Sequence, residues 1–265
     1  MLLEGRTAVI YGGSGAIGSA VARVFAREGA RLYLAGRTQE RLDGVAREIA
    51  AGGGTVETAR LDVLDQRAVA EQAARVAERA GGIDIVLNAV SFPHVQGTPL
   101  VDLSLEAFLL PIESFLRALF ITSKAVAPYM GKRRPGVILT LSTPGAKLAS
   151  AGDLGHVVSV AGTEAFSRVL AAELAASNVR VVCIRPHAIS DAPAAGSYTQ
   201  ELFAQRGAAA GVTGAELLAA FAQQTMLKRL PTLADVAEMA AFLASDKAAA
   251  ITGTVANLTG GALVD

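Results

Sequence analysis

The chain has 265 residues, of which 52% are hydrophobic and 18% are charged, so it carries enough apolar material for one large core. Its 24 basic and 24 acidic side chains cancel, which gives no electrostatic reason to expect nucleic acid or an anionic membrane as a partner. No run approaches the roughly 20 apolar residues that span a bilayer, and the first residues lack the pattern of a secretory signal. With a single cysteine, Cys183, the composition predicts a cytoplasmic protein without a membrane span.

Short β-branched runs alternate with longer alanine-rich segments of helical pattern. Most of the short runs are continuously apolar, as expected for parallel strands covered on both faces, and each longer segment can form a crossover helix. The predicted strands are residues 7–11, 31–35, 55–62, 83–88, 136–141, 179–184 and 253–258. The predicted helices are residues 16–28, 38–50, 65–79, 105–131, 156–176 and 233–244. The pattern therefore predicts one α/β domain over residues 1–265, a doubly wound Rossmann-type fold with about seven parallel strands and helices on both faces.

Residues 191–225 interrupt this alternation after the sixth predicted strand. The segment is rich in alanine and glycine and returns as short helical patterns. A long excursion at this place suits a mobile lid over a bound ligand. A surface insertion without a role is the alternative.

The stretch "TAVIYGGSGAIG" is a strand followed by a glycine-rich turn that opens a helix. Gly12, Gly15 and Gly18 allow the backbone to turn tightly and to approach a diphosphate, to which the N–H groups of the helix offer partial positive charge. Because the turn follows the first strand and precedes the first helix, it predicts nucleotide binding and not a plain tight turn.

From this turn to the last strand, the sequence resembles the short-chain dehydrogenase/reductase family. Gly12 and Gly18 match glycines of the family's T-G-x-x-x-G-x-G pattern, although its threonine and its middle glycine are replaced here. "LDV" around Asp62 resembles the family's adenine-contacting pair, "LNAV" around Asn88 resembles its N-N-A-G motif, and residues 228–265 follow its C-terminal pattern. The cofactor-binding residues that the resemblance implies are Gly12, Ser14, Gly15, Ile17, Gly18, Asp62, Val63, Asn88, Ala89 and Pro186.

The second predicted strand ends in "LAGRTQERL". An NAD-selective site places Asp or Glu here to accept hydrogen bonds from the ribose hydroxyls, whereas this chain has Gly36 followed by Arg37. A guanidinium at this point can pair with a 2′-phosphate. The sequence therefore favours NADP(H) over NAD(H), the alternative being that Arg37 is a solvated surface charge.

The resemblance also implies a catalytic set of Asn, Ser, Tyr and Lys that delivers a proton to the substrate oxygen. The aligned positions hold Phe115, Thr143, His156 and Val160, so only the Thr143 hydroxyl is retained in kind. A free imidazole titrates near pH 6.5 and can give or take a proton, and His156 with Thr143 is therefore the predicted catalytic pair. Asp153, three residues before His156, is interpreted as an N-cap of the helix, although it could also lie near the imidazole.

His94, His156 and His187 each follow a predicted strand, the fourth, fifth and sixth, whose carboxyl ends share one edge of the sheet. They could form an acid/base cluster, a metal site, or three loop histidines without a joint role. No closely spaced ligand pair supports a metal, and none is predicted. The predicted substrate pocket comprises His94, Phe115, His187 and Tyr198.

These features leave several functions open. The first is an NADP(H)-dependent oxidoreductase that transfers hydride to or from a small carbonyl or alcohol substrate with an altered proton donor. The others are a non-catalytic nucleotide-binding or scaffold protein, and a lyase or isomerase that reuses the pocket. By the same resemblance, the apolar and small residues of the helices over 105–131 and 156–176 predict a homo-oligomer, either a tetramer or a dimer; packing within one subunit is the alternative.

Overall fold

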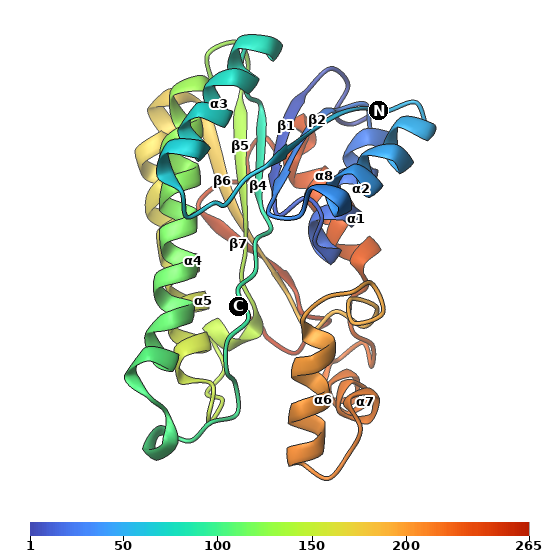
Figure 1. Cartoon of the computed structure of the whole chain (residues 1–265), viewed down its shortest axis with the longest axis vertical. Helices are drawn as coiled ribbons and strands as arrows, with labels where there is room; N and C mark the ends of the chain where they lie inside the picture. Colours follow the sequence, from blue (N-terminus) through green and yellow to red (C-terminus); the bar gives the residue numbers. More distant parts are fainter. Residues whose placement is uncertain (265) are drawn as a thin grey trace.

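Across residues 1–264, the part of the chain that this computed structural model describes, seven parallel strands form one central sheet (Figure 1). The strands are β1 (Thr7–Tyr11), β2 (Arg31–Gly36), β3 (Thr55–Arg60), β4 (Ile85–Asn88), β5 (Gly136–Leu141), β6 (Val179–Pro186) and β7 (Thr254–Leu258). They lie in the order β3-β2-β1-β4-β5-β6-β7. The strand order reverses between β1 and β4, and this is where open α/β sheets leave a crevice for ligands. The predicted Rossmann-type fold is confirmed.

Helices cover both faces of the sheet. They are α1 (Ala16–Arg27), α2 (Gln39–Ala51), α3 (Gln66–Ala80), α4 (Leu105–Val126), α5 (Leu154–Leu174), α6 (Thr199–Ala209), α7 (Gly214–Gln224) and α8 (Leu233–Ala244). Figure 1 shows α3, α4 and α5 on one face and α1, α2 and α8 on the other, while α6 and α7 extend beyond the carboxyl ends of the strands. Among the described helices, none combines the length and the apolar character that a bilayer crossing requires.

Alternation within β1 explains why its sequence is apolar throughout. Ala8 and Ile10 belong to the core between the sheet and the α1 and α8 face, whereas Val9 and Tyr11 belong to the core under α3 and α4. All four side chains are fully buried. A strand that is buried on both sides needs apolar residues at every position, because neither set of side chains meets water.

Two helices differ in extent from the prediction. The helix expected over 105–131 is α4, which ends at Val126 and continues as a single 3-10 turn over Ala127–Tyr129. Pro128 lies in that turn and has no N–H with which to continue the α-helical ladder. In contrast, α5 begins at Leu154, two residues before the predicted start.

The excursion over residues 191–225 contains the two short helices α6 and α7, which pack against each other. Their contact depends on small residues, because a Cβ on Gly207 would lie 2.8 Å from the backbone carbon of Thr213. A capping box of Thr213 and Glu216 begins α7. The role of the excursion as a lid remains a prediction.

Candidate active site

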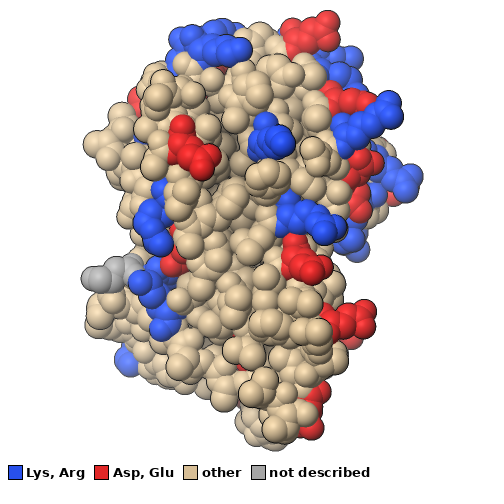
Figure 2. Space-filling view, turned by 90° about the vertical axis from the view of Figure 1, so that its left-hand side faces the viewer, with Lys and Arg blue, Asp and Glu red and all other residues tan. Residues whose placement is uncertain are grey.

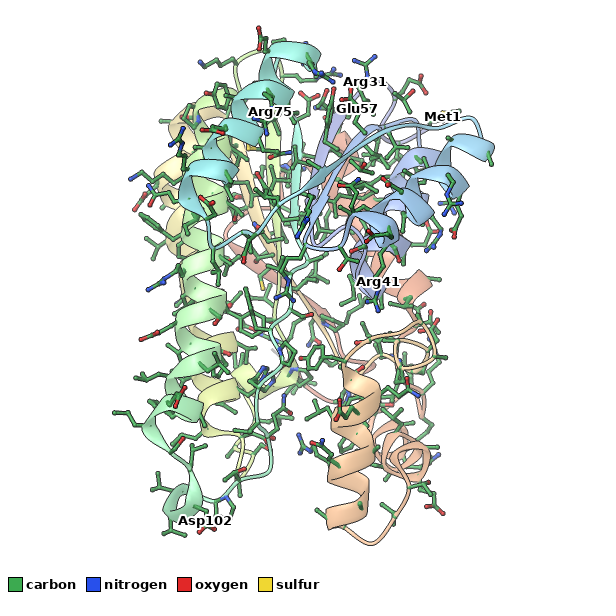
Figure 3. The ribbon with its side chains drawn as sticks, viewed as in Figure 1. Met1, Arg31, Arg41, Glu57, Arg75 and Asp102 are labelled. Atoms are coloured by element: carbon green, nitrogen blue, oxygen red, sulfur yellow. The ribbon has the colours of Figure 1, made fainter. Side chains whose placement is uncertain are left out.

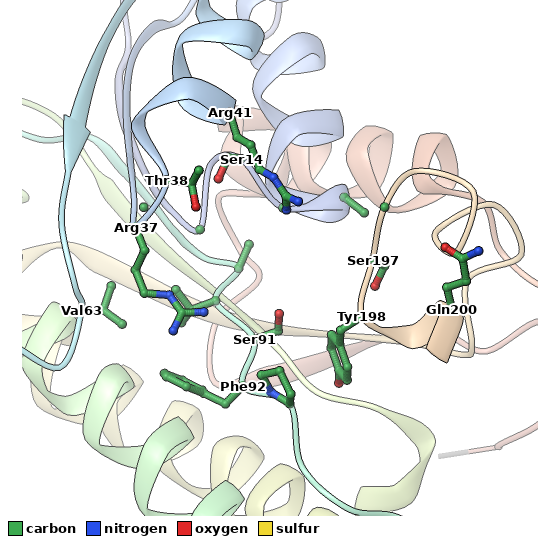
Figure 4. Close-up of a pocket in the computed structure, with 18 of the residues that line it drawn as sticks. Ser14, Arg37, Thr38, Arg41, Val63, Ser91, Phe92, Ser197, Tyr198 and Gln200 are labelled. Carbon is green, nitrogen blue, oxygen red and sulfur yellow. The ribbon is translucent and has the colours of Figure 1, made fainter. Parts of the chain in front are cut away.

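A cavity of about 670 Å³ opens at the carboxyl ends of β1, β2 and β4, at the reversal of the strand order. One wall is the glycine turn, defined here as residues 12–18, and others are the start of α2 and residues 89–93 after β4. The first turn of α6 and the residues before it, among them Tyr198, bound the cavity from the opposite side (Figure 4). The excursion after β6 therefore forms part of the wall of this site.

The glycine turn is packed too closely for side chains at two positions. Gly12 has a φ of +81°, and a Cβ there would lie 2.5 Å from the carbonyl oxygen of Ala89. A Cβ on Gly18 would lie 2.2 Å from the carbonyl oxygen of Gly12. No side chain caps α1 at Gly15, so the N–H groups of its first turn remain available at the cavity. This arrangement fits a diphosphate cradle.

Two arginines enter the cavity at the end of β2. Figure 4 shows the guanidinium group of Arg41 near Ser14 and that of Arg37 on the side of Val63 and Phe92. Neither arginine has an acidic partner within residues 1–264. Arg41 was not predicted, although its spacing of four from Arg37 places it in the first turn of α2. Figure 3 shows that Arg41 lies at the carboxyl side of the sheet, away from Glu57.

The other predicted cofactor-binding residues separate into two groups. Asp62 and Val63 line the cavity, and the Asp62 carboxylate accepts a hydrogen bond from the Leu64 N–H at 3.0 Å. Asn88 does not line the cavity; its Oδ1 accepts a hydrogen bond from the Thr122 hydroxyl at 2.8 Å, which joins α4 to β4. Its Nδ2 is buried without a partner in the described residues. The residues that line the cavity are Gly12, Ser14, Gly15, Arg37, Asp62, Val63 and Ala89, whereas Ile17, Gly18, Asn88 and Pro186 do not line it.

The predicted pair of Thr143 and His156 is in contact. Thr143 follows β5, His156 lies in the first turn of α5, and the Thr143 Oγ1 is 3.0 Å from the His156 Nε2. The His156 Nδ1 is 3.0 Å from the Nε2 of His94, which lies in the loop after β4. The His94 Nδ1 in turn is 2.6 Å from the carbonyl oxygen of Phe92. The sheet edge thus holds a continuous hydrogen-bonded chain of a hydroxyl, two imidazoles and a carbonyl.

Both imidazoles of this chain are neutral at neutral pH. Burial, followed by repulsion from His94, lowers the pKa of His156 to about 4, and burial also lowers the pKa of His94. The expectation that His156 titrates like a free imidazole is therefore wrong. At pH 7 only about one His156 in a thousand carries the extra proton, which favours acceptance of a proton over its donation.

This shift makes stability depend on pH. In the unfolded chain His156 binds a proton near pH 6.5, whereas in the folded chain it does so near pH 4. Its contribution is therefore present above pH 6.5 and is lost as the pH falls toward 4. We expect the unfolding free energy of the wild type to fall by about 2 kcal/mol more than that of His156→Gln between pH 8 and pH 5, measured by urea titration. Parallel pH profiles for the two proteins would contradict the lowered pKa.

The Asp153 side chain does not act as the helix cap that the sequence suggested. It lies at the N-cap position of α5 but makes no side-chain capping bond. Its buried carboxylate instead accepts hydrogen bonds from the Gly97 N–H at 2.9 Å, from the Ser150 hydroxyl, and from Arg206 at 3.2 Å. These donors leave the carboxylate turned away from the helix terminus. The interpretation as an N-cap is correct for its position and wrong for its side chain.

Only some of the predicted substrate-pocket residues lie close to one another. Phe115 packs edge-to-face against His94 with ring centroids 5.8 Å apart, and the Tyr198 ring lies 6.4 Å from His94. His187 is separate: its ring packs on Phe221, and its Nδ1 accepts a hydrogen bond from the Ala188 N–H. Two of the three histidines are therefore joined. Within residues 1–264, no group of three or more His, Cys, Asp or Glu side chains could hold a metal ion.

Two polar residues of the site were missed by the sequence analysis. Gln96 Nε2 lies 3.2 Å from the His94 Nε2, and the Arg206 Nη1 donates to the Gln96 Oε1 at 2.8 Å. Arg206 belongs to α6, 110 positions from Gln96 in the chain. No local pattern connects residues so far apart, so only the fold could place them together.

The parallel sheet, the glycine turn and the cavity at the reversal of the strand order define a dinucleotide-binding protein of Rossmann type. The chain belongs to the short-chain dehydrogenase/reductase family: the family profile described as "Enoyl-(Acyl carrier protein) reductase" matches residues 13–262. It is accordingly an oxidoreductase of this family, with a nicotinamide cofactor and a small-molecule substrate.

Named relatives cover the whole chain. The oxidoreductase UcpA of Salmonella typhimurium is 32% identical over 260 residues, which is 98% of this chain and 95% of the relative. The 3-oxoacyl-[acyl-carrier-protein] reductase FabG of Thermotoga maritima is 29% identical over 269 residues, 100% of each chain. The crystal structure of a short-chain dehydrogenase/reductase described as a glucose/ribitol dehydrogenase, from Brucella melitensis, superimposes with a TM-score of 0.84 at 26% identity, and the match covers 100% of this chain and 99% of that one.

Proposed function

We propose that this protein is an NADP(H)-dependent oxidoreductase that interconverts a small alcohol and its carbonyl compound, with His156 in place of the family's tyrosine. The single observation that carries the proposal is the 3.0 Å contact of Thr143 with His156, at the sheet edge that also holds the glycine turn. A nicotinamide cofactor, when bound, would supply the hydride acceptor for an alcohol carbon or the hydride donor for a carbonyl carbon. The protein has to orient the substrate oxygen and exchange its proton.

Thr143 and His156 can divide these two tasks. A substrate hydroxyl that enters between them can accept a hydrogen bond from the Thr143 O–H and donate its own proton to the His156 Nε2. As the proton leaves, the Thr143 hydroxyl stabilises the negative charge that develops on the substrate oxygen. Val160, which is 6% exposed at the position of the family's lysine, places hydrocarbon where relatives place a cation. The proton therefore passes to a neutral base that has no lysine beside it one helical turn later.

The preference for NADP(H) is supported by the two arginines at the end of β2. Arg37 and Arg41 border the same corner of the cavity as the Ser14 hydroxyl, and β2 ends in Gly36 without a carboxylate. A 2′-phosphate in this corner would gain charge-assisted hydrogen bonds from both guanidinium groups. The acidic residues that line the same cavity, Asp62 and Glu201, form no ion pair with Arg37 or Arg41 within the described part of the chain.

Removing this positive charge should weaken the binding of NADPH more than the binding of NADH. We expect Arg37→Ala and Arg41→Ala each to raise the Kd for NADPH about 10- to 100-fold and to change the Kd for NADH less than about twofold, because only NADPH carries the 2′-phosphate. Fluorescence titration of both nucleotides measures this. The matched control is Arg47→Ala, which removes an exposed arginine from α2, the helix that also carries Arg41. An equal rise in Kd for the two nucleotides would contradict the proposal that Arg37 and Arg41 bind the 2′-phosphate.

We also propose that the protein forms a homo-oligomer, either a tetramer or a dimer, in which subunits contact one another through the face formed by α4 and α5. Several large apolar side chains are exposed there, including Leu105 at 71% and Phe120 at 53% on α4, and Val169 at 57% on α5. Figure 2, which views this side of the molecule, shows a broad area without charged residues. Apolar surface of this extent is typical of protein contacts.

A further inference from the structure

We propose that Arg206, Gln96 and His94 are positioning residues that hold His156 with its proton on Nδ1 and leave its Nε2 as a hydrogen-bond acceptor. The inference rests on the proposed function in taking His156 as the proton-exchanging group. It goes further by fixing the direction of every hydrogen bond at the site and by assigning a role to a residue of α6.

Arg206 sets the direction of the hydrogen bonds at one end of the chain that runs through Gln96 and His94 to His156. A guanidinium has donors only, so the 2.8 Å contact of the Arg206 Nη1 requires the Gln96 oxygen on its side. The same guanidinium also donates to the Asp153 carboxylate at 3.2 Å, which holds it in place. The Gln96 amide nitrogen is then turned toward the His94 Nε2, 3.2 Å away. Because an amide NH₂ only donates, the His94 Nε2 carries no proton.

A backbone carbonyl sets the direction of the hydrogen bond on the other side of the His94 ring. The Phe92 oxygen lies 2.6 Å from the His94 Nδ1, and a carbonyl oxygen only accepts. The His94 Nδ1 therefore carries the ring proton. His94 is a neutral imidazole with one tautomer, fixed from both sides by groups that cannot change their roles. Burial, which lowers the pKa of His94, acts in the same direction.

His94 passes this constraint to His156. Since the His94 Nε2 carries no proton, it can only accept from the His156 Nδ1 at 3.0 Å, and its single lone pair is shared by the Gln96 N–H and the His156 Nδ1–H in a three-centre hydrogen bond. In a neutral His156 the Nε2 is then unprotonated, and the Thr143 hydroxyl, 3.0 Å away, donates to it. The resting site thus presents an acceptor to the substrate. A substrate O–H bond can break with its proton bound at the His156 Nε2, while the His156 Nδ1–H keeps its hydrogen bond to His94. The imidazolium then releases the proton to solvent.

The charged and titratable groups near His156 come from three elements. His94 lies in the loop after β4, Asp153 precedes α5, and Arg206 belongs to α6; Asp153 raises the pKa of His156, whereas the other two lower it. Arg206 thus acts in two ways, by its charge and by orienting Gln96. A variant that reverses the Gln96 hydrogen bond separates these effects.

The first measurement determines the tautomers without any substrate. Long-range ¹H–¹⁵N spectra of full-length protein with ¹⁵N-labelled histidine distinguish protonated from unprotonated ring nitrogens, and His156→Gln and His94→Gln assign the signals. We expect at pH 7.5 a protonated Nδ1 and an unprotonated Nε2 for both His94 and His156. A protonated Nε2 on His156 at this pH overturns the proposal.

The second measurement uses Gln96→Glu, which has the same shape and replaces the donor by an acceptor. A carboxylate accepts, so it favours a second proton on His94, at Nε2, while the Phe92 carbonyl keeps the first proton on Nδ1. The resulting His94 imidazolium can only donate to the His156 Nδ1, which becomes an acceptor, and the His156 proton moves to Nε2. We expect this tautomer change in the spectra, and a fall in kcat of at least about tenfold with little change in KM. Gln205→Glu, on the exposed face of α6, adds the same charge and should keep the wild-type spectrum.

The outcomes distinguish the two proposals. An unchanged His156 tautomer in Gln96→Glu overturns the positioning role of Gln96 and Arg206, whatever the activity. The expected tautomers together with no turnover on any alcohol or carbonyl compound would refute the proposed function and leave the hydrogen-bond directions standing. Arg206→Lys, which retains a donor, should preserve the wild-type tautomers, and their loss in this variant would contradict the role of Arg206 as donor.

Discussion

Replacing His156 by phenylalanine is expected to lower kcat for alcohol oxidation by about 10²- to 10⁴-fold, the usual contribution of a positioned acid or base. Phenylalanine retains a ring beside His94 but has no nitrogen to accept the substrate proton. The Kd for NADPH should change less than about threefold, because His156 does not line the cavity around the glycine turn. Steady-state kinetics on a panel of secondary alcohols, with nucleotide titration, measure both quantities.

The control for this prediction is Arg168→Ala, an exposed position on the same helix, which should retain the wild-type rate. The pH profile adds a second check. Because the pKa of His156 is lowered to about 4, oxidation by the wild type should fall only when the pH approaches that value, since the base is unprotonated above it. Brisk turnover by His156→Phe would remove the imidazole from the mechanism.

Replacing Gly18 by alanine is expected to raise the Kd for NADPH more than tenfold and to lower the unfolding free energy by about 1–3 kcal/mol. The added Cβ would lie 2.2 Å from the Gly12 carbonyl oxygen, so either the glycine turn or α1 must shift. A shift of either element displaces the N–H groups that face the diphosphate. Nucleotide titration and urea unfolding measure the two effects.

Gly44→Ala is the matched control for this substitution. Gly44 lies within α2, and a Cβ there meets no atom within 4 Å. Alanine is the better helix former, so this variant should gain up to about 1 kcal/mol of stability and should bind NADPH like the wild type. Wild-type nucleotide binding by Gly18→Ala would contradict the tight packing of the glycine turn.

The fold was predictable because its signals are local. Continuous apolar runs such as residues 7–11 mark strands buried on two faces, and the glycines at 12 and 18 mark a close backbone approach. The contact of Thr143 with His156 was also predictable, because both positions were aligned with catalytic positions of the family that the sequence resembles.

The remainder of the site depends on contacts that the sequence does not encode locally. The pair of His94 and His156 forms across 62 positions, and its lowered pKa values result from burial, which no motif reports. His187 follows a strand as His94 does, yet its ring packs on Phe221 of α7, so His187 does not join the pair of His94 and His156. Position at a sheet edge therefore predicts proximity, whereas side-chain direction decides which groups meet.

The neutral state of the two imidazoles has a consequence for inhibitor design. A carboxylate or phosphonate built to reach His156 would find no cationic imidazole with which to pair, because burial keeps the proton off both rings at physiological pH. An uncharged compound that carries a hydroxyl or an amide N–H has a better match in the unprotonated Nε2 of His156, where it can replace the Thr143 hydroxyl as the donor. Screening collections for this protein should therefore be weighted toward neutral donors.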